Sequence, residues 1–356
     1  MAADEATVEC EAVMRSTLVA KRYALTERVL AGSYASTVLL ANAHDDSAQV
    51  AVKVLMKSHF SSEQDRRSAR MEVAIHSSML PHRNVLSLLA AEETPEAILL
   101  VTPFTPDGDL WSLMQYGQTF GEGQVRNCVA QMLSAVAHVH DVCGLVHADI
   151  KPQNFLLSLK DGQYALQLCD FGFAERPGPD GYVKFSVVRG TSGWLAPEML
   201  RCSDYSFPLD LFGLGLIGFR MLGGYAPFDP PSRFQPTVDY DERCWCHIGD
   251  PCRRFLSKLL SIDPAGRGTA AGARNDLWIA GPEPELPTPK QIERLSRYGP
   301  PPDMSMRFWP AECVPEQPRC CLGDAERSTV VLSPCASSED DLASDFSELI
   351  SPLAAA

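Results

Sequence analysis

Two kinds of hydrophobic pattern divide the chain near residue 105. Before that point the apolar residues form short strand-like runs. Residues 50–53 alternate between apolar and polar, as in a half-buried strand, and residues 97–101 are continuously apolar, as in a fully buried one. After that point the spacing becomes helical, and apolar residues within residues 123–142 recur every three or four positions. The pattern predicts strands at residues 50–53 and 97–101 and a helix over residues 123–142.

Both ends of the chain depart from these patterns. Residues 1–22 have no regular spacing, which predicts a flexible N-terminal extension. From residue 281 the sequence is rich in proline and later in serine and acidic residues. Such a composition cannot bury enough apolar surface to offset the entropy lost on ordering. Residues 281–356 are therefore predicted to be a proline-rich linker and an acidic disordered tail.

One stretch of the tail, residues 337–350, carries a helical stripe. Its apolar residues fall on one helical face: Leu342, Phe346, Leu349 and Ile350. A helix this short is marginal alone in water, so the stripe would need a groove on a partner or on the chain itself. We expect either a docking segment for a partner or a solvated tail in which the stripe arose by chance.

Charge and hydropathy exclude some classes of function. The formal net charge of the 356 residues is -14, whereas a nucleic-acid-binding face requires a basic patch. The longest apolar stretch, residues 211–219, is too short to span a bilayer, and the chain does not open on a secretion signal. We expect neither a nucleic-acid partner nor a membrane association, and we take the protein to be a monomer.

The cysteines indicate a reducing compartment and do not indicate a metal site. Twelve of them are scattered along the chain, which favours reduced thiols in the cytoplasm or nucleus over a disulfide framework. Residues 244–252 hold three cysteines and a histidine, but their spacing is not that of paired C-x-x-C zinc ligands. This spacing favours ordinary cysteines over a zinc site.

The candidate chemistry is concentrated in residues 147–154, HADIKPQN. Asp149 and Asn154 lie five positions apart, with Lys151 between them. A loop of this kind can hold an acceptor hydroxyl against Asp149 while Asn154 holds a metal on the phosphate side and Lys151 neutralises charge. The alternative is a polar surface turn. A second acidic candidate follows in the Asp-Phe-Gly turn at residues 170–172.

These motifs resemble those of the eukaryotic protein kinase superfamily, serine/threonine branch. Residues 147–154 are similar to the family's catalytic loop and residues 170–172 to its magnesium loop. Residues 50–53, VAVK, are similar to its V-A-I-K strand, and residues 190–198, GTSGWLAPE, to the end of its activation segment. The resemblance extends over about residues 23–280 in the family's motif order.

The resemblance implies an α+β protein with the bilobal protein-kinase fold. Residues 23–105 would form the small β-rich N-lobe with the hinge, and residues 106–280 the larger helical C-lobe. It further implies that Asp210 hydrogen-bonds the backbone of the catalytic loop and that Arg267 forms a buried ion pair with Glu198.

The resemblance also implies which residues transfer the γ-phosphoryl group of ATP to a serine or threonine of a protein substrate. Asp149 would orient the acceptor hydroxyl and Lys151 would steady the transferred group, with Thr191 in the same catalytic set. Lys53 would hold the α- and β-phosphates, aimed by an ion pair with Glu72 of a helix.

Cofactor binding follows from the same comparison. Asn154 and Asp170 would coordinate Mg²⁺. The implied ATP-binding residues are Leu30, Gly32, Val38, Ala51, Lys53, Thr102, Phe104, Asp109, Leu156 and Asp170. For Asp109 a second role stays open, because a carboxylate in front of a helix also serves as its N-cap.

The sequence departs from the family pattern in the glycine-rich loop and at several single positions. Of the glycines in the glycine-rich loop Gly32 alone remains, and this loss affects how strongly the loop can hold phosphates. His76 replaces an apolar residue that the family stacks on the phenylalanine of the Asp-Phe-Gly turn. Ala148 replaces the arginine that in many kinases receives an activation-loop phosphate. Gln153 and Arg220 stand where members with basic substrates carry acids.

These departures lead to three expectations. His76 could loosen the helix that carries it, activity should not depend on activation-loop phosphorylation, and any preference for basic substrates should be weak. The alternative functions are a pseudokinase or scaffold that binds nucleotide weakly and acts through protein interactions, and a small-molecule kinase, which would not need residues 191–198 to dock a peptide.

Overall fold

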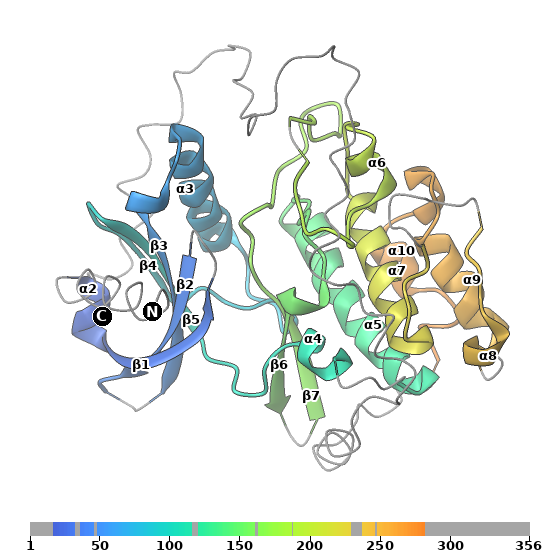
Figure 1. Ribbon diagram of the computed structural model, residues 1–356, viewed down its shortest axis with the longest axis horizontal. Coiled ribbons are helices and arrows are strands. Elements are labelled where there is room, and N and C mark those ends of the chain that lie inside the picture. The colour runs from blue at the N-terminus through green and yellow to red at the C-terminus, as the bar shows by residue number, and fades with distance from the viewer. Residues whose placement is uncertain are drawn as a thin grey trace.

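The chain folds into two lobes, a small one built on a sheet and a larger one built from helices (Figure 1). The computed structural model describes residues 17–32, 36–45, 48–115, 120–160, 163–186, 188–228, 237–245 and 248–281. The chain passes from the small lobe to the large one after strand β5 (Ala97–Pro103). The predicted α+β class and bilobal arrangement are confirmed.

The N-lobe is a five-stranded antiparallel sheet in the order β1-β2-β3-β5-β4. Its other elements are β1 (Tyr23–Gly32), β2 (Ser36–Ala43), β3 (Gln49–Met56), the 3-10 turn η1 (Lys57–His59) and β4 (Ala90–Glu93). Along β3 the residues Val50, Val52 and Val54 are buried in one core cluster, whereas Ala51 and Lys53 are half-buried. The alternation predicted for residues 50–53 thus points Lys53 away from that core.

Helix α3 (Glu63–Ser78) covers the other face of the sheet (Figure 1). Ser62 and Asp65 form a capping box at its start, in which each side chain accepts a hydrogen bond from the other residue's backbone N–H. Helix and sheet share a small apolar cluster of Leu55, Ala69, Val73, Ile98 and Leu100. This contact fixes where α3 lies relative to β3.

The C-lobe is organised around helix α7 (Pro208–Gly223), which is buried along nearly all its length. The other elements are α4 (Leu110–Met114), α5 (Glu122–Ala137), the π-helical turn η2 (His138–Val142), the 3-10 turn η3 (Pro152–Asn154), β6 (Phe155–Lys160), β7 (Gln163–Leu168), α6 (Pro197–Leu200), α8 (Glu242–Trp245), α9 (Asp250–Leu259), the 3-10 turn η4 (Pro264–Arg267) and α10 (Ala270–Arg274). A Cβ at Gly213 would lie 2.7 Å from the Cβ of Ile150, so this glycine lets α7 approach the catalytic loop closely.

Both predicted structural contacts of the C-lobe are confirmed. The carboxylate of Asp210 on α7 accepts hydrogen bonds from the backbone N–H groups of His147, at 2.8 Å, and Ala148, at 2.9 Å. Arg267 donates through both terminal nitrogens to Glu198, at 2.6 and 2.9 Å, and this pair is buried.

The N-terminal extension differs from the prediction in the part that the structure describes. Residues 18–22 form helix α2 (Leu18–Arg22), which Thr17 caps by accepting from the N–H of Ala20. Val19 is 1% exposed in the core of the N-lobe, and its N–H donates to Glu92 of β4 at 2.8 Å. Five helical residues are too few to produce a hydrophobic period, so sequence spacing could not reveal them.

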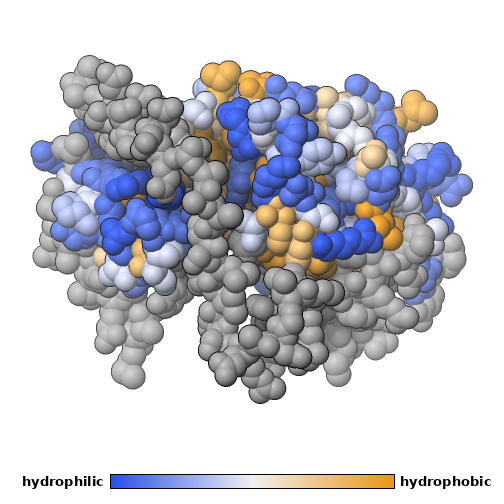
Figure 2. Space-filling model, turned by 90° about the horizontal axis from the view of Figure 1, so that it is seen from above, coloured by the Kyte–Doolittle hydropathy of each residue, from blue (hydrophilic) through white to orange (hydrophobic). Residues whose placement is uncertain are grey.

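Two of the four residues of the cysteine-histidine cluster, Cys246 and His247, lie outside the described residues. The tail lies outside them as well, and the docking segment at residues 337–350 therefore stays a prediction. Within the described ranges the cysteines are free thiols. The same ranges contain no group of three or more histidine, cysteine or acidic side chains that could hold a metal ion. No helix among them is long and apolar enough to cross a membrane. On the side drawn in Figure 2, the coloured surface is largely hydrophilic, with hydrophobic residues in separate groups.

Candidate active site

Helix α7 supports the catalytic loop through hydrogen bonds to its backbone. Ala148 has a φ of 62°, a left-handed conformation that costs energy for a residue with a Cβ. Its N–H and that of His147 both donate to Asp210, so two charge-assisted hydrogen bonds offset this strain. The His147 ring also lies 3.1 Å from the carbonyl oxygen of Cys169, which ties the loop to the strand that precedes Asp170.

Asp149 lies at the centre of a closed set of polar contacts. Its Oδ2 accepts from the ammonium group of Lys151 at 2.6 Å, and its Oδ1 accepts from the hydroxyl of Thr191 at 2.9 Å. Lys151 also donates to Thr191 Oγ1 at 2.7 Å. The amide of Asn154 donates to the backbone oxygen of Asp149 at 2.8 Å and to its Oδ2 at 3.2 Å. The structure thus brings together the four predicted residues of the catalytic loop and activation segment.

Lys53 joins the two lobes. Its ammonium group donates to Glu72 Oε1 of α3 at 2.6 Å and to Asp170 Oδ1 at 2.9 Å. Burial alone would lower the pKa of Lys53, but the charges of Asp170 and Glu72 outweigh it and raise that pKa above its ordinary value. Burial alone would raise the pKa of Asp170, yet Lys53 holds that pKa at about 2. Burial raises the pKa of Glu72 above its ordinary value, and the ammonium group of Lys53 opposes that rise. Lys53 and Asp170 are thus the charged pair of this triad.

His76 does not loosen α3 in this arrangement. Its ring is buried and lies 5.1 Å from the ring of Phe171, and its Nε2 is 2.8 Å from the carbonyl oxygen of Leu86. The His147 ring contacts Phe171 from another side at 5.2 Å. The stacking expected of an apolar residue is preserved, and burial lowers the pKa of His76, which favours the neutral ring.

The predicted ATP-binding residues line the sheet and the region where the lobes meet. Leu30, Val38, Ala51, Thr102, Phe104 and Leu156 are all partly exposed, and Gly32 is exposed at the end of β1. Strand register places Ala51 opposite Thr102 and Val38 opposite Lys53. Residues 33–35, the tip of the glycine loop, lie outside the described residues.

Asp109 is the N-cap of α4. Its Oδ1 accepts from the backbone N–H and the hydroxyl of Ser112, both at 2.7 Å. Of the two roles left open by the sequence, the structure contains the cap. The same carboxylate oxygen is therefore already engaged within its own helix.

The oxygen-bearing side chains of Asn154 and Asp170 suit a hard cation. Asp170 has a side chain 41% exposed and a φ of 62°, and the N–H of Cys169 beside it donates to the backbone oxygen of Asn154 at 2.9 Å. Mg²⁺ prefers one or two protein oxygen ligands together with substrate phosphates and water. This pair fits such a site.

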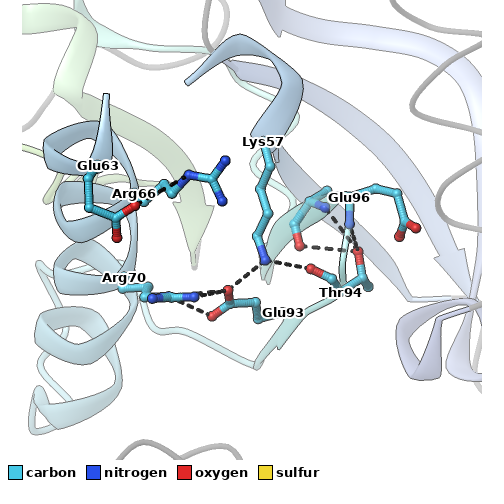
Figure 3. A network of polar contacts seen from close by, with 8 residues as sticks. Lys57, Glu63, Arg66, Arg70, Glu93, Thr94 and Glu96 are labelled. Carbon is cyan, nitrogen blue, oxygen red and sulfur yellow. Dashed lines mark hydrogen bonds and ion pairs between the residues drawn. The ribbon is translucent and has the colours of Figure 1, made fainter. Parts of the chain in front are cut away.

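One cluster of polar contacts beside the site was not foreseen from the sequence. Glu93 at the end of β4 accepts from Arg70 of α3 through three contacts of 2.8 to 3.2 Å and from Lys57 at 2.6 Å (Figure 3). Burial alone would raise the pKa of Glu93, but these partners lower it. Lys57 also donates to the carbonyl oxygen of Thr94 at 2.6 Å. The cluster fastens α3 to the sheet two residues from Glu72.

The activation segment is tied down by ion pairs of its own. Arg189, just before Gly190, forms an ion pair with Glu175. Lys184 donates to Asp180 at 2.6 Å and to Asp204 at 3.0 Å. No periodic spacing accompanies such pairs, so the sequence offered no signal for them.

Residues 23–279 match the family model of the protein kinase domain. The chain belongs to the protein kinase family. This protein kinase is 30% identical over 265 residues to a calcium/calmodulin-dependent protein kinase type I of Schizosaccharomyces pombe, a match that covers 72% of this chain and 78% of the relative. It is 28% identical over 270 residues to myosin light chain kinase A of Dictyostelium discoideum, covering 74% and 90% of the two chains.

A human relative gives the same result. Calcium/calmodulin-dependent protein kinase type 1B of Homo sapiens is 28% identical over 266 residues, which covers 73% of this chain and 75% of that protein. The predicted enzyme class, a serine/threonine protein kinase that uses ATP and acts on proteins, is confirmed by the family and these relatives.

Proposed function

We propose that this kinase is catalytically active and that Asp149 orients the serine or threonine hydroxyl of a protein substrate for phosphoryl transfer. The observation that carries the proposal is the position of the Thr191 hydroxyl, which donates to Asp149 at 2.9 Å and accepts from Lys151 at 2.7 Å. A substrate hydroxyl in the same place would donate a hydrogen bond to the carboxylate of Asp149, and its oxygen would lie beside the ammonium group of Lys151.

The remaining roles follow from charge. Lys53, aimed by Glu72, would bind the α- and β-phosphates of ATP. Asn154 and Asp170 would hold Mg²⁺, which supplies charge neutralisation when bound. Lys151 would steady the transferred group, because its ammonium group already lies between Asp149 and Thr191. Catalysis of this kind consists mainly of positioning and electrostatic stabilisation.

The competing proposal, a pseudokinase or scaffold, rests on the single glycine left in the glycine-rich loop. The complete polar set around Asp149 and Lys53 favours an enzyme, because a protein that acts only through its surface has no chemical need for it. The small-molecule alternative is disfavoured because Thr191 and the segment after it are positioned beside Asp149.

The test is phosphorylation of a peptide library by the purified kinase with Mg-ATP. We expect phosphoserine or phosphothreonine, and Asp149→Asn should lower kcat by about 10²- to 10⁴-fold. Asp141→Asn is the matched control, since Asp141 is exposed and lies outside the site. A wild-type protein that binds ATP without transferring phosphate would refute the proposal.

The proposal also covers the compartment, the oligomeric state and a partner for the tail. The free thiols of the described cysteines suit a reducing compartment, so we propose that the kinase is located in the cytoplasm or nucleus. We also propose that it is a monomer. Residues 337–350 would dock a partner. They contain five acidic residues and no basic one, whereas calmodulin targets are basic amphipathic helices, so this segment does not suit calmodulin. Comparing the proteins recovered with the full chain and with a chain lacking residues 330–356 tests the docking.

A further inference from the structure

Arg220, in the last turn of α7, is a largely buried arginine whose described partners include no carboxylate. Its Nη2 donates to the carbonyl oxygen of Gly193 at 3.1 Å, and its guanidinium lies 4.1 Å from the ring centroid of Trp194. Its Nε is buried and makes no hydrogen bond. Arg267, a fully buried arginine of the same lobe, donates through both terminal nitrogens to Glu198. Arg267 is thus neutralised by a carboxylate, whereas Arg220 contacts a neutral carbonyl group and an aromatic ring.

A guanidinium that contacts no carboxylate among the described residues needs an explanation in such a place. Buried charges in folded proteins are normally paired, because removing an ion from water is costly. Burial lowers the pKa of Arg220 to about 10, so the side chain is still charged at neutral pH. A neutral carbonyl and an aromatic face supply part of the missing solvation. Within the described residues, the hydrogen bond of Nη2 to Gly193 leaves other N–H donors of this guanidinium without an acceptor, and these could bind an anion supplied by a substrate.

The space for that anion lies beside the side chain. Arg220 lines a small hollow that is partly open to solvent. The other lining residues are Gly193, Leu195, Phe212, Leu216, Ala226, Pro227 and Phe228. Apart from the guanidinium this lining is apolar, so it suits a short methylene stem that ends in a carboxylate.

The hollow is close to the place where a substrate hydroxyl would be held. Gly193, which accepts from Arg220, is two residues from Thr191, a span of at most about 7 Å along an extended chain. Leu195 lines both this hollow and the space beside Asp149 and Thr191. A side chain two or three residues from a phosphorylated serine could therefore reach the guanidinium.

We propose that this hollow is a substrate subsite for the carboxylate of an aspartate or glutamate within three residues of the phosphorylated serine or threonine. Arg220 is its specificity-determining residue, and the inference rests on the proposed function. A preference for acidic substrates agrees with Asp109, whose carboxylate is engaged as a helix cap. The bidentate geometry of arginine with carboxylate supplies the recognition.

The test is a positional-scanning peptide library with serine or threonine at the centre and aspartate, glutamate, alanine, lysine or arginine at each flanking position. For the wild-type kinase we expect one flanking position at which an acid raises kcat/KM about tenfold over alanine, mainly through KM. Arg220→Leu should remove most of that ratio. Arg220→Glu should reverse it, so that lysine or arginine becomes the preferred residue at the same position.

The matched control is Arg253→Leu. Arg253 also stands over an aromatic ring, Tyr240, at 6.0 Å and donates to a backbone oxygen, that of Trp245. Its replacement should keep the acid preference. Because each comparison is a ratio between peptides on one protein, a loss of stability does not imitate the effect, and thermal unfolding of each variant is measured alongside.

Two other outcomes overturn the subsite. Wild-type kinase that phosphorylates the library without an acid preference, or an acid preference that Arg220→Glu leaves intact, would leave Arg220 with only a structural role. A library that is not phosphorylated at all would overturn the proposed function as well, so the two failures are distinguishable.

Discussion

The two lobes hold their catalytic groups by different kinds of contact. In the C-lobe the side chain of Asp149 is 2% exposed, and its loop is supported by Asp210, which is fully buried. In the N-lobe Lys53 is 23% exposed, and the helix that carries its partner is fastened by Arg70, which is 43% exposed. Buried charge pairs cannot be broken cheaply, whereas pairs in contact with water are individually weak. The C-lobe half of the site is therefore rigid, and the N-lobe half is adjustable.

The largest test of this comparison is Arg267→Ala. The change would leave Glu198 charged and buried without a partner, and it would also remove the hydrogen bonds from Arg267 to the backbone oxygens of Ser261 and Pro208. We expect a loss of about 3–5 kcal/mol in the free energy of unfolding, measured by chemical denaturation. Arg274→Ala, at an exposed position, is the control and should change stability by less than about 0.5 kcal/mol.

A double variant sharpens that result. Adding Glu198→Ala to Arg267→Ala removes the stranded charge, so the double variant should be more stable than the sum of the two single losses predicts. If Arg267→Ala is as stable as the wild type, the C-lobe is not held by its buried pair and the comparison fails.

The second test is Glu93→Gln in the N-lobe. The amide would weaken the contacts to Arg70 and Lys57 that fasten α3 to the sheet, and so would relax the aim of Glu72. Because these pairs are partly exposed, we expect stability to change by less than about 1 kcal/mol and kcat/KM to fall by about two- to fivefold. Both are measured on the same preparation.

The control for that variant is in the same turn. Glu96 is exposed, and Figure 3 shows its carboxylate pointing away from Arg70, so Glu96→Gln should keep the wild-type rate. Raising the salt concentration should lower the wild-type rate in the same direction as Glu93→Gln, since salt screens exposed pairs. Unfolding of Glu93→Gln, or an unchanged rate, would show that the two lobes do not differ in this way.

The same contrast explains how much the sequence could predict. Asp149, Lys151 and Asn154 form one local motif, and their contacts follow from a loop in which five positions separate the outer two. Lys53 and Glu72, 19 positions apart, were paired only through the family resemblance, and the structure contains that pair. Motif order thus identified the fold, and it predicted the residues that the structure brings together around Asp149 and Lys53.

Other contacts could not be predicted, for physical reasons. Glu93 pairs with residues 23 and 36 positions away, and any exposed acid on a neighbouring strand would have fitted the sequence equally well. Helix α2 depends on one cap and on Val19, whose burial is a tertiary effect. His76 was expected to loosen α3 because its ring is polar, but the carbonyl oxygen of Leu86 lies within hydrogen-bonding distance of that ring.

The smallest expected effect concerns phosphorylation of the activation segment. Ala148 has no guanidinium to receive a phosphate, and the segment is instead anchored by the ion pair of Arg189 with Glu175. Phosphatase treatment of the purified kinase should therefore leave kcat/KM unchanged in a peptide assay. Arg189→Ala, which removes the internal anchor, should lower it by about two- to fivefold, as expected for a partly exposed pair. A large loss of activity on phosphatase treatment that maps to Ser186 or Thr191 would mean that the rigid half of the site is assembled only after modification.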